Sequence, residues 1–467
     1  MMKQKKENSW ICFVVFFGVI WGLNLGFFIS QSFGQTLIDA LAKSYTSNPT
    51  LEAARAQLRA TDEKVPQALS GWRPTLTGNA SYGHEQEYTD TNQPLINAVE
   101  DERQPRDATL DFTQPIFRGF RTVSSTEQAD NLVFAARARL FAVEQDVLLR
   151  SITAYVDVVR DQSVLELNTN NEAVLKRQLE ATQERFQVGE ITRTDVAQAE
   201  ARLARSTAQR IASQGDLSSS RAIYKEVVGD MPGTLKTPPL PTNLPTSMDE
   251  VVRSAFYNPN VKEAEFSEKA ARNQVDVAFG EMLPSVSLRG SIGVSKDVGR
   301  DDVYNRDGII KAQVTIPLYQ AGNVDARVRE AKQSVSQRRQ EIDEERRRAE
   351  QGAARSWLAW QTSQAQLVSL ESQIRSAELA LEGVKQESMV GTRTILDVLD
   401  AEQELLDAKV AYVTAERDRL VAAYSIFAAT GHLTARDLQL PVQYYNYEEH
   451  YDKVKNKFFG VGESIDP

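Results

Sequence analysis

Apolar residues recur along much of the chain with the spacing of paired helices. In the second half they alternate at intervals of three and four, the a/d pattern of a coiled coil, at Leu367, Leu370, Ile374, Ala377, Leu381 and Val384. A seven-residue spacing continues upstream at Val328, Val335, Ile342 and Ala349, and downstream at Leu399, Leu406, Val413, Leu420 and Phe427. The first half has a helical stretch from Phe120 to a break near Gly189, which is about 70 residues and roughly 100 Å. The pattern predicts helices far longer than one globular domain, packed side by side.

Four other segments alternate between apolar and polar residues and predict strands. The clearer two are residues 285–294 and 310–316, and residues 75–88 and 108–114 repeat the pattern more faintly. Segments of about ten alternating residues are typical of outer-membrane β-barrels, although each strand could also belong to the half-solvated sheet of a soluble domain. Four strands cannot close a barrel alone, because the smallest barrels need about eight. If these strands span a membrane, the chain must oligomerise.

The second half of the chain is a copy of the first. Asn48-Pro49 recurs 210 residues later as Asn258-Pro259, and Val188-Gly189 recurs 202 residues later as Val390-Gly391. The difference gives the first copy eight extra residues, which we expect in a loop within the polar stretch from Glu85 to Asp107. Each copy is expected to contain a short helix, two strands and a long helical stretch with one break.

The repeat divides the chain into five parts. They are a signal peptide (1–34), a first repeat (35–230) with its break near 189–195, a proline-rich linker (231–246), a second repeat (247–440) with its break near 390–400, and an aromatic tail (441–467). The linker is expected to be extended, because its prolines cannot continue a helix. The tail is too aromatic for plain disorder, and we expect it to pack outside the helices near the middle of their length.

The N-terminus has the layout of a secretory signal. Lysines are followed by an apolar run from Trp10 to Ile29, and small residues precede Gln35. The run is also long enough for an uncleaved membrane anchor, which remains the alternative. No later segment approaches 18 consecutive apolar residues, so any other membrane crossing would not use a hydrophobic helix.

Composition argues against catalysis and nucleic-acid binding. The formal charge is −10, from 54 Lys and Arg against 64 Asp and Glu, whereas nucleic-acid affinity depends on basic patches. The chain has one cysteine, Cys12, and three histidines that are far apart, so neither a disulfide framework nor a metal site is expected. It has no phosphate-binding G-x-x-x-x-G-K-[ST] loop and no G-x-S-x-G nucleophile elbow. We therefore expect no enzyme activity and no cofactor.

Both breaks in the long helical stretches resemble a known motif. The segments Met389–Glu402 and Phe186–Val196 are similar to the helix tips of the TolC family of outer-membrane exit ducts, and the duplication and strand pairs match in order. The resemblance implies a mainly helical homotrimer with membrane β-structure. Each protomer would give four strands to one twelve-stranded outer-membrane barrel, which a coiled-coil tube continues through the periplasm.

The resemblance also implies partners. Members of this family are passive ducts in outer-membrane lipid that dock onto a periplasmic adaptor and an inner-membrane pump of the ABC or RND type, and they export small molecules or, in type I secretion, proteins. A structural coiled-coil protein of the envelope and a periplasmic adaptor without channel activity are the alternatives. The first would not explain the strands and tips, and the second would not need four strands.

Residue roles at the tips follow from the same resemblance. Asp397 and Asp400 would line the periplasmic mouth as two carboxylate rings, although aspartates near a helix start can simply complement the helix dipole. The first copy has Gln198 where the second has Asp400, so only the second copy would build both rings. Arg393 would latch the closed tip onto Thr194 and Asp195, but Ser388 stands where the family often has a latch tyrosine.

Five further tip residues are candidates for contact with an adaptor. They are Val188, Gly189, Val390, Gly391 and Thr392. Glycine at a tight tip exposes backbone to a partner. The alternative is that both glycines only cap helices.

Overall fold

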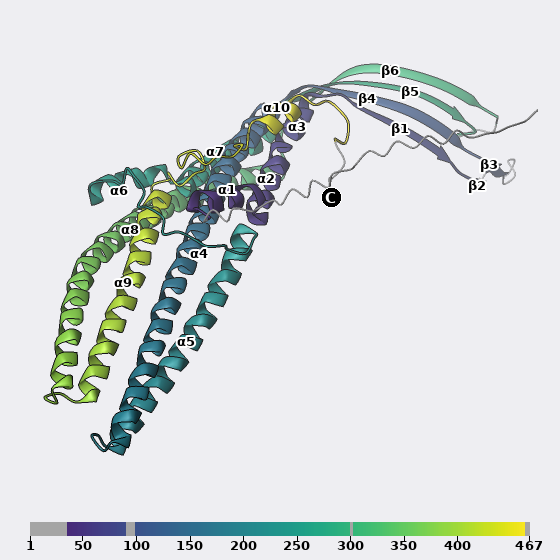
Figure 1. Ribbon diagram of the computed structural model, residues 1–467. Coiled ribbons are helices and arrows are strands. Elements are labelled where there is room, and N and C mark those ends of the chain that lie inside the picture. The colour runs from purple at the N-terminus through teal and green to yellow at the C-terminus, as the bar shows by residue number, and fades with distance from the viewer. Residues whose placement is uncertain (1–34, 90–98, 299–301, 463–467) are drawn as a thin grey trace, which may run out of the picture.

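Two long helical hairpins and a curved sheet lie at opposite ends of the molecule (Figure 1). The computed structural model describes residues 35–89, 99–298 and 302–462, so the expected signal peptide lies outside the described residues. Short helices and the C-terminal segment surround the part of the hairpins nearest the sheet (Figure 1). The fold is mainly helical with one four-stranded sheet, which confirms the predicted class.

The helices follow the repeat. The first copy contains α1 (Leu37–Ser47), α2 (Pro49–Asp62), α3 (Lys64–Leu69), α4 (Arg121–Gln187) and α5 (Arg193–Val228). The second contains α6 (Met248–Ser254), α7 (Pro259–Phe279), α8 (Asn323–Met389) and α9 (Ile395–Ala429), and α10 (Glu449–Lys455) follows in the tail. Both α4 and α8 have 67 residues, which corresponds to about 100 Å. The single short helix expected before the strands is three helices in the first copy, because Asn48-Pro49 and Glu63 start new segments.

The coiled-coil positions lie on buried faces as predicted. Leu367, Ala377 and Leu381 of α8 are buried, as are Leu399 and Leu406 of α9. The two helices of each hairpin contact each other along the hairpin, α4 with α5 and α8 with α9. Towards the sheet, α4 instead contacts α2, α3 and α7, so the long helix is covered by different partners along its length.

The duplicated Asn-Pro motif has the same structural role in both copies. The side chains of Asn48 and Asn258 cap α2 and α7, and each following proline occupies the first helical turn, where its missing N–H costs nothing. The amide of Asn48 also donates to the carbonyl of Val227 (2.9 Å), and that of Asn258 donates to the carbonyl of Ala429 (3.2 Å). In each repeat, one asparagine thus joins the start of the strand-side helix to the end of the second hairpin helix.

The sheet contains β1 (Thr75–Tyr82), β4 (Arg106–Arg118), β5 (Ser285–Lys296) and β6 (Tyr304–Thr315) in the order β1-β4-β5-β6. Every neighbouring pair is antiparallel, and the two repeats join where β4 pairs with β5. Side chains alternate between two faces, so one face carries Leu76, Leu110, Phe112 and Ile292 while the other carries Thr77, Asp111 and Ser291.

The extra residues of the first copy are not a plain loop, which corrects the sequence prediction. The polar stretch from Glu85 to Asp107, in which the loop was expected, contains two paired strands, β2 (Glu85–Thr89) and β3 (Val99–Arg103), beyond the end of β1. The backbone N–H of Gly83 donates to the carbonyl of Pro105 (2.9 Å), which carries the hairpin past the end of β1 and β4. The strand predicted over residues 75–88 is divided into β1 and β2, and the polar composition hid β3, because its pairing with β2 depends on the backbone rather than on an apolar face.

The largest core lies where the two repeats meet. Tyr155 of α4, Tyr224 of α5 and Leu433 after α9 are fully buried in it together with Leu41 and Leu51 of the first two helices. The Tyr155 hydroxyl donates to the carbonyls of Gln35 and Lys236 (both 2.8 Å), so this core also holds the start of the described chain and the linker. Among the described residues, no helix combines the length and the apolarity needed to cross a membrane.

The C-terminal tail packs on the first repeat. Its Tyr451 hydroxyl donates to Asp130 of α4 (2.8 Å), and His450 lies 3.1 Å from the buried carboxylate of Asp62. Beyond α10, Arg73 donates to the carbonyl of Lys457 (2.7 Å) next to the start of β1. The tail therefore packs outside the helices as expected, but its contacts lie on the part of α4 nearest the sheet and continue to the start of β1, rather than lying near the middle of the helices.

Two corners where helix meets strand touch through their backbones. A Cβ placed on Gly280, at the end of α7, would lie 2.4 Å from the carbonyl oxygen of Gly119, at the end of β4.

We expect Gly280→Ala to lower the free energy of unfolding by about 1–3 kcal/mol through overpacking. Thermal unfolding of the purified protein, followed by circular dichroism, measures this. Gly352→Ala is the control, because Gly352 is inside α8 with open space around it and should be neutral or stabilising. Equal effects of both changes would contradict the close contact.

Candidate functional site at the helix tips

The two hairpin tips are built alike. Each first helix ends in a glycine with positive φ, Gly189 (81°) and Gly391 (80°). The N–H of Glu190 donates to the carbonyl of Arg185, and that of Thr392 donates to the carbonyl of Glu387 (both 3.0 Å). These are the bonds of a Schellman motif, which ends a helix by satisfying its last carbonyls. The helix-capping alternative for both glycines therefore holds.

Each second helix starts with a capping box. The N–H and hydroxyl of Thr394 donate to one carboxylate oxygen of Asp397 (2.9 and 2.8 Å), and the Asp397 N–H donates back to the hydroxyl (3.2 Å). Thr192 and Asp195 make the same bonds at the first tip. The Thr394 N–H and hydroxyl hold the pKa of Asp397 below its usual value, and the Thr192 hydroxyl and N–H do the same for the pKa of Asp195. Both carboxylates therefore stay ionised.

Arg393 lies at the second tip and pairs within its own hairpin. Its guanidinium donates to Glu387 (2.9 Å), and both side chains are about half exposed. Within the protomer, the guanidinium of Arg393 pairs with Glu387 and not with Thr194 or Asp195. Arg185 and Glu190 make a comparable pair at the first tip (3.0 Å).

The sequence analysis missed the partner of Asp400. Arg202 of α5 forms an ion pair with Asp400 of α9, so a carboxylate of the second hairpin is tied to the first hairpin. Next to this pair, Leu175 of α4 packs in a small apolar cluster with Ile395 and Leu399 of α9. The two hairpins of one protomer are thus joined close to their tips by one ion pair and one apolar contact.

The five expected adaptor contacts lie at the extreme ends of the tips. Val188 and Val390 are 72% and 75% exposed, and a Cβ on either tip glycine would meet open space. Met389 is exposed to a similar extent, 77%, beside Val390. Each tip therefore presents an exposed apolar side chain next to a glycine turn that no other part of the protomer covers.

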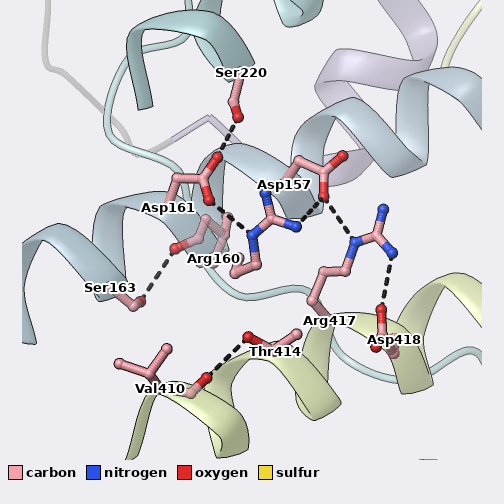
Figure 2. Close-up of polar contacts among 10 residues, drawn as sticks. Asp157, Arg160, Asp161, Ser163, Ser220, Val410, Thr414, Arg417 and Asp418 are labelled. Atoms are coloured by element: carbon pink, nitrogen blue, oxygen red, sulfur yellow. Dashed lines mark hydrogen bonds and ion pairs between the residues drawn. The ribbon is translucent and has the colours of Figure 1, made fainter. Parts of the chain in front are cut away.

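A partly buried polar cluster joins the hairpins further from the tips (Figure 2). Arg417 of α9 donates to Asp157 of α4 (2.7 Å), and Arg160 bridges Asp157 (3.1 Å) and Asp161 (2.7 Å). The hydroxyl of Ser220, on α5, donates to Asp161. We call Asp157, Arg160, Asp161, Ser220 and Arg417 the hairpin hub, because it joins α4, α5 and α9. In the described part of the chain, no group of histidine, cysteine and carboxylate side chains could hold a metal ion.

Arg417 and Asp157 should be strongly coupled. Their side chains are only 22% and 23% exposed, so a double-mutant cycle with Arg417→Met and Asp157→Asn is expected to give a coupling energy of about 1–2 kcal/mol. Urea unfolding of the purified protein measures it. The control cycle is Arg338 with Glu341, an exposed pair within α8, where about 0.3–0.5 kcal/mol is expected. Equal coupling energies in the two cycles would contradict the expectation that the Arg417–Asp157 pair holds the hairpins together more strongly than an ordinary pair within one helix.

Comparison with known proteins supplies the family. The family model described as "Outer membrane efflux protein" matches residues 40–228 and 255–432. The outer membrane efflux protein BepC of Brucella suis is 34% identical over 431 residues, which cover 91% of this chain and 92% of BepC. The outer membrane protein TolC of Escherichia coli is 26% identical over 438 residues, covering 90% of this chain and 87% of TolC.

The fold is also shared with solved channels. The CmeC outer membrane channel of Campylobacter jejuni matches with a TM-score of 0.75 at 17% identity, covering 90% of this chain and 89% of that one. Both the sequence repeats and the sheet-and-hairpin architecture are therefore accounted for. The chain belongs to the outer membrane efflux protein family and is an outer-membrane exit duct that extends into the periplasm.

Proposed function

We propose that three copies of this chain close into one duct, which is shut at its periplasmic end by the helix tips. The observation that carries the proposal is the four-stranded sheet with an apolar face, whose outer strands β1 and β6 each pair on one side only. Unpaired strand edges are costly in lipid, and closure with further copies removes them. Three such sheets give twelve strands, an even number within the range of known outer-membrane barrels.

The helical part offers a second surface for the same assembly. Leu358, Val368 and Leu379 of α8 are 49–77% exposed in the protomer. Apolar side chains at these positions are expected to be covered by a neighbouring copy. The hairpins of the three copies would then form a tube below the barrel.

The closed state depends on contacts at the tips. The Arg202–Asp400 pair and the cluster around Leu399 hold α9 against the first hairpin. In the trimer, Arg393 would exchange Glu387 for Thr194 and Asp195 of a neighbouring tip, and these directional contacts can be broken when the tips are pulled apart. Opening is then a movement of the α8–α9 hairpin rather than a chemical step.

The partners follow from the exposed tips. Val188, Gly189, Val390, Gly391 and Thr392 would contact a periplasmic adaptor, which connects the duct to an inner-membrane ABC or RND-type pump. The duct would supply no energy and carry out no reaction. Its cargo would be the small molecules or proteins that the pump delivers.

Removing a tip contact should open the resting duct. We expect Arg393→Ala to assemble normally and to raise the closed-state current in planar lipid bilayers several-fold, because one latch contact per protomer is lost. Arg202→Gln should act in the same direction, and the double variant should conduct more than either. Arg185→Ala is the matched control, since it removes an exposed tip pair that is not part of the proposed latch. Unchanged resting current in Arg393→Ala would contradict the latch.

The aspartates should confer block by cations. If Asp397 and Asp400 line the mouth, divalent and trivalent cations will inhibit the current, and Asp397→Asn or Asp400→Asn will weaken this block roughly tenfold or more. Glu190→Gln removes an exposed carboxylate of the first tip that belongs neither to the mouth nor to the latch, and it should leave the block unchanged. Block that persists in the double variant Asp397→Asn and Asp400→Asn would place the constriction elsewhere.

A further inference from the structure

One row of the sheet combines basic and aromatic residues across all four strands. Tyr82 of β1 pairs with Arg106 of β4, Arg106 pairs with Lys296 of β5, and Lys296 pairs with Tyr304 of β6. Directly paired residues point to the same face, and Arg306 follows Tyr304 by two positions on that face. We call Tyr82, Arg106, Lys296, Tyr304 and Arg306 the basic row.

The basic row lies on the apolar face of the sheet. Counting by two along each strand, Arg106 shares its face with Leu110 and Phe112, and Lys296 shares its face with Ile292. The opposite face carries Asp107, Asp111 and Asp307, together with Arg289 and Lys311. The cations of the apolar face are therefore confined to one end of it. The three aspartates just named point to the opposite face of the sheet.

This end of the sheet is the one furthest from the helices. β1 begins at Thr75, directly after the short helical turn that follows α3, and it ends at Tyr82. Figure 1 shows the strands running away from the helical part towards β2 and β3. If the strands cross the outer membrane as proposed above, the basic row lies at the level of the outer leaflet.

The cations of the row are available for a ligand. Arg106 lies over the Tyr82 ring (5.3 Å) and donates to Gln104 (3.2 Å), and Arg306 lies over the Tyr304 ring (5.1 Å) and donates to its hydroxyl (3.1 Å). Neither arginine has a carboxylate partner within the described residues. Lys296 is 3.9 Å from Asp297 and 3.8 Å from Asp302, which are long contacts for ion pairs. The aromatic rings hold the arginines in place without neutralising them.

An apolar hollow lies next to the row on the same face. It has a volume of about 590 Å³ and is lined by Leu110, Phe112, Leu288, Gly290, Ile292 and Gly308. Gly290 and Gly308 leave the space, because they add no side chain to this face. Ile292 is four residues from Lys296 along β5, and Gly308 is two residues from Arg306 along β6, so the hollow begins about 7–13 Å from the row.

We infer that the basic row binds phosphate groups of outer-leaflet lipid and that the hollow receives an acyl chain of the same molecule. Charge complementarity selects the headgroup, since three cations stand at the end of a face that is otherwise apolar. The aromatic residues are those preferred at a membrane interface. This inference rests on the proposed orientation of the sheet in the membrane, and it adds a specific lipid site to the duct.

The test compares lipid A with dephosphorylated lipid A that has the same acyl chains. Each is titrated in detergent against the purified full-length protein, and binding is measured from the rise in the unfolding temperature. We expect lipid A to bind the unaltered protein more tightly than its dephosphorylated form. The variant carrying Arg106→Gln, Lys296→Gln and Arg306→Gln should bind lipid A roughly tenfold to a hundredfold more weakly.

A matched control uses the opposite face of the same strands. Arg289 and Lys311 are register partners on β5 and β6, and Arg289→Gln with Lys311→Gln should leave lipid A binding unchanged. If the triple variant folds poorly, the three single variants should each lose part of the affinity. Equal binding of the two lipids, an unaffected triple variant, or equal weakening by the control would each overturn the site. Planar-bilayer currents separate the two proposals: a protein that does not conduct contradicts the duct, whereas a conducting protein without phosphate preference contradicts only the lipid site.

Discussion

The burial of α4 along its whole length is the constraint on which the structure depends. A helix of 67 residues cannot be covered by one compact domain, so it needs successive partners along about 100 Å. The first repeat supplies α2, α3 and α5, and the second supplies α7 and α9. The duplication meets this requirement, because α7 and α9 of the second copy cover the faces of α4 that the helices of the first copy leave uncovered.

The same constraint explains why the repeats are unequal. α4 lies between α5 and α9 and buries residues such as Leu148, Ile152 and Val158, whereas α8 lies at one side and leaves Val368 and Leu379 exposed. The two tips therefore have the same geometry, although their long helices are buried to different extents. Asp397 and Asp195 cap their helices in the same way, yet only the second tip adds Asp400. Capping does not compete with a role for Asp397 in the mouth, since its bonds to Thr394 use one carboxylate oxygen and favour the ionised form.

Features with a local period could be predicted from the sequence. The heptads, the four strands of the main sheet and the two tips each leave a signal within a few residues, because apolar spacing and glycine report directly on backbone geometry. Contacts between distant segments left no such signal. Arg202 and Asp400 are 198 residues apart, and their meeting depends on how two hairpins cross. The strand predicted over residues 75–88 includes most of β2, but the pairing of β2 with β3 was not predicted. A polar two-stranded ribbon needs no apolar face, so the composition of β3 is that of a loop.

In the proposed duct, the hairpin hub and the tip contacts determine how the tips would open. Arg417 and Asp400 are 17 residues apart on α9, which is about 25 Å along the helix. At the hub, α9 is held by a polar cluster largely removed from water, whereas at the tip it is held by an exposed ion pair and a few apolar side chains. Because the tip contacts are the weaker ones, a pull on the tips should break them first and leave the hub intact. The α8–α9 hairpin would then swing about the hub, and a tilt of about 10° would move Asp400 by roughly 4 Å over that length. Three such movements around one axis would widen the mouth without disturbing the core that joins the repeats.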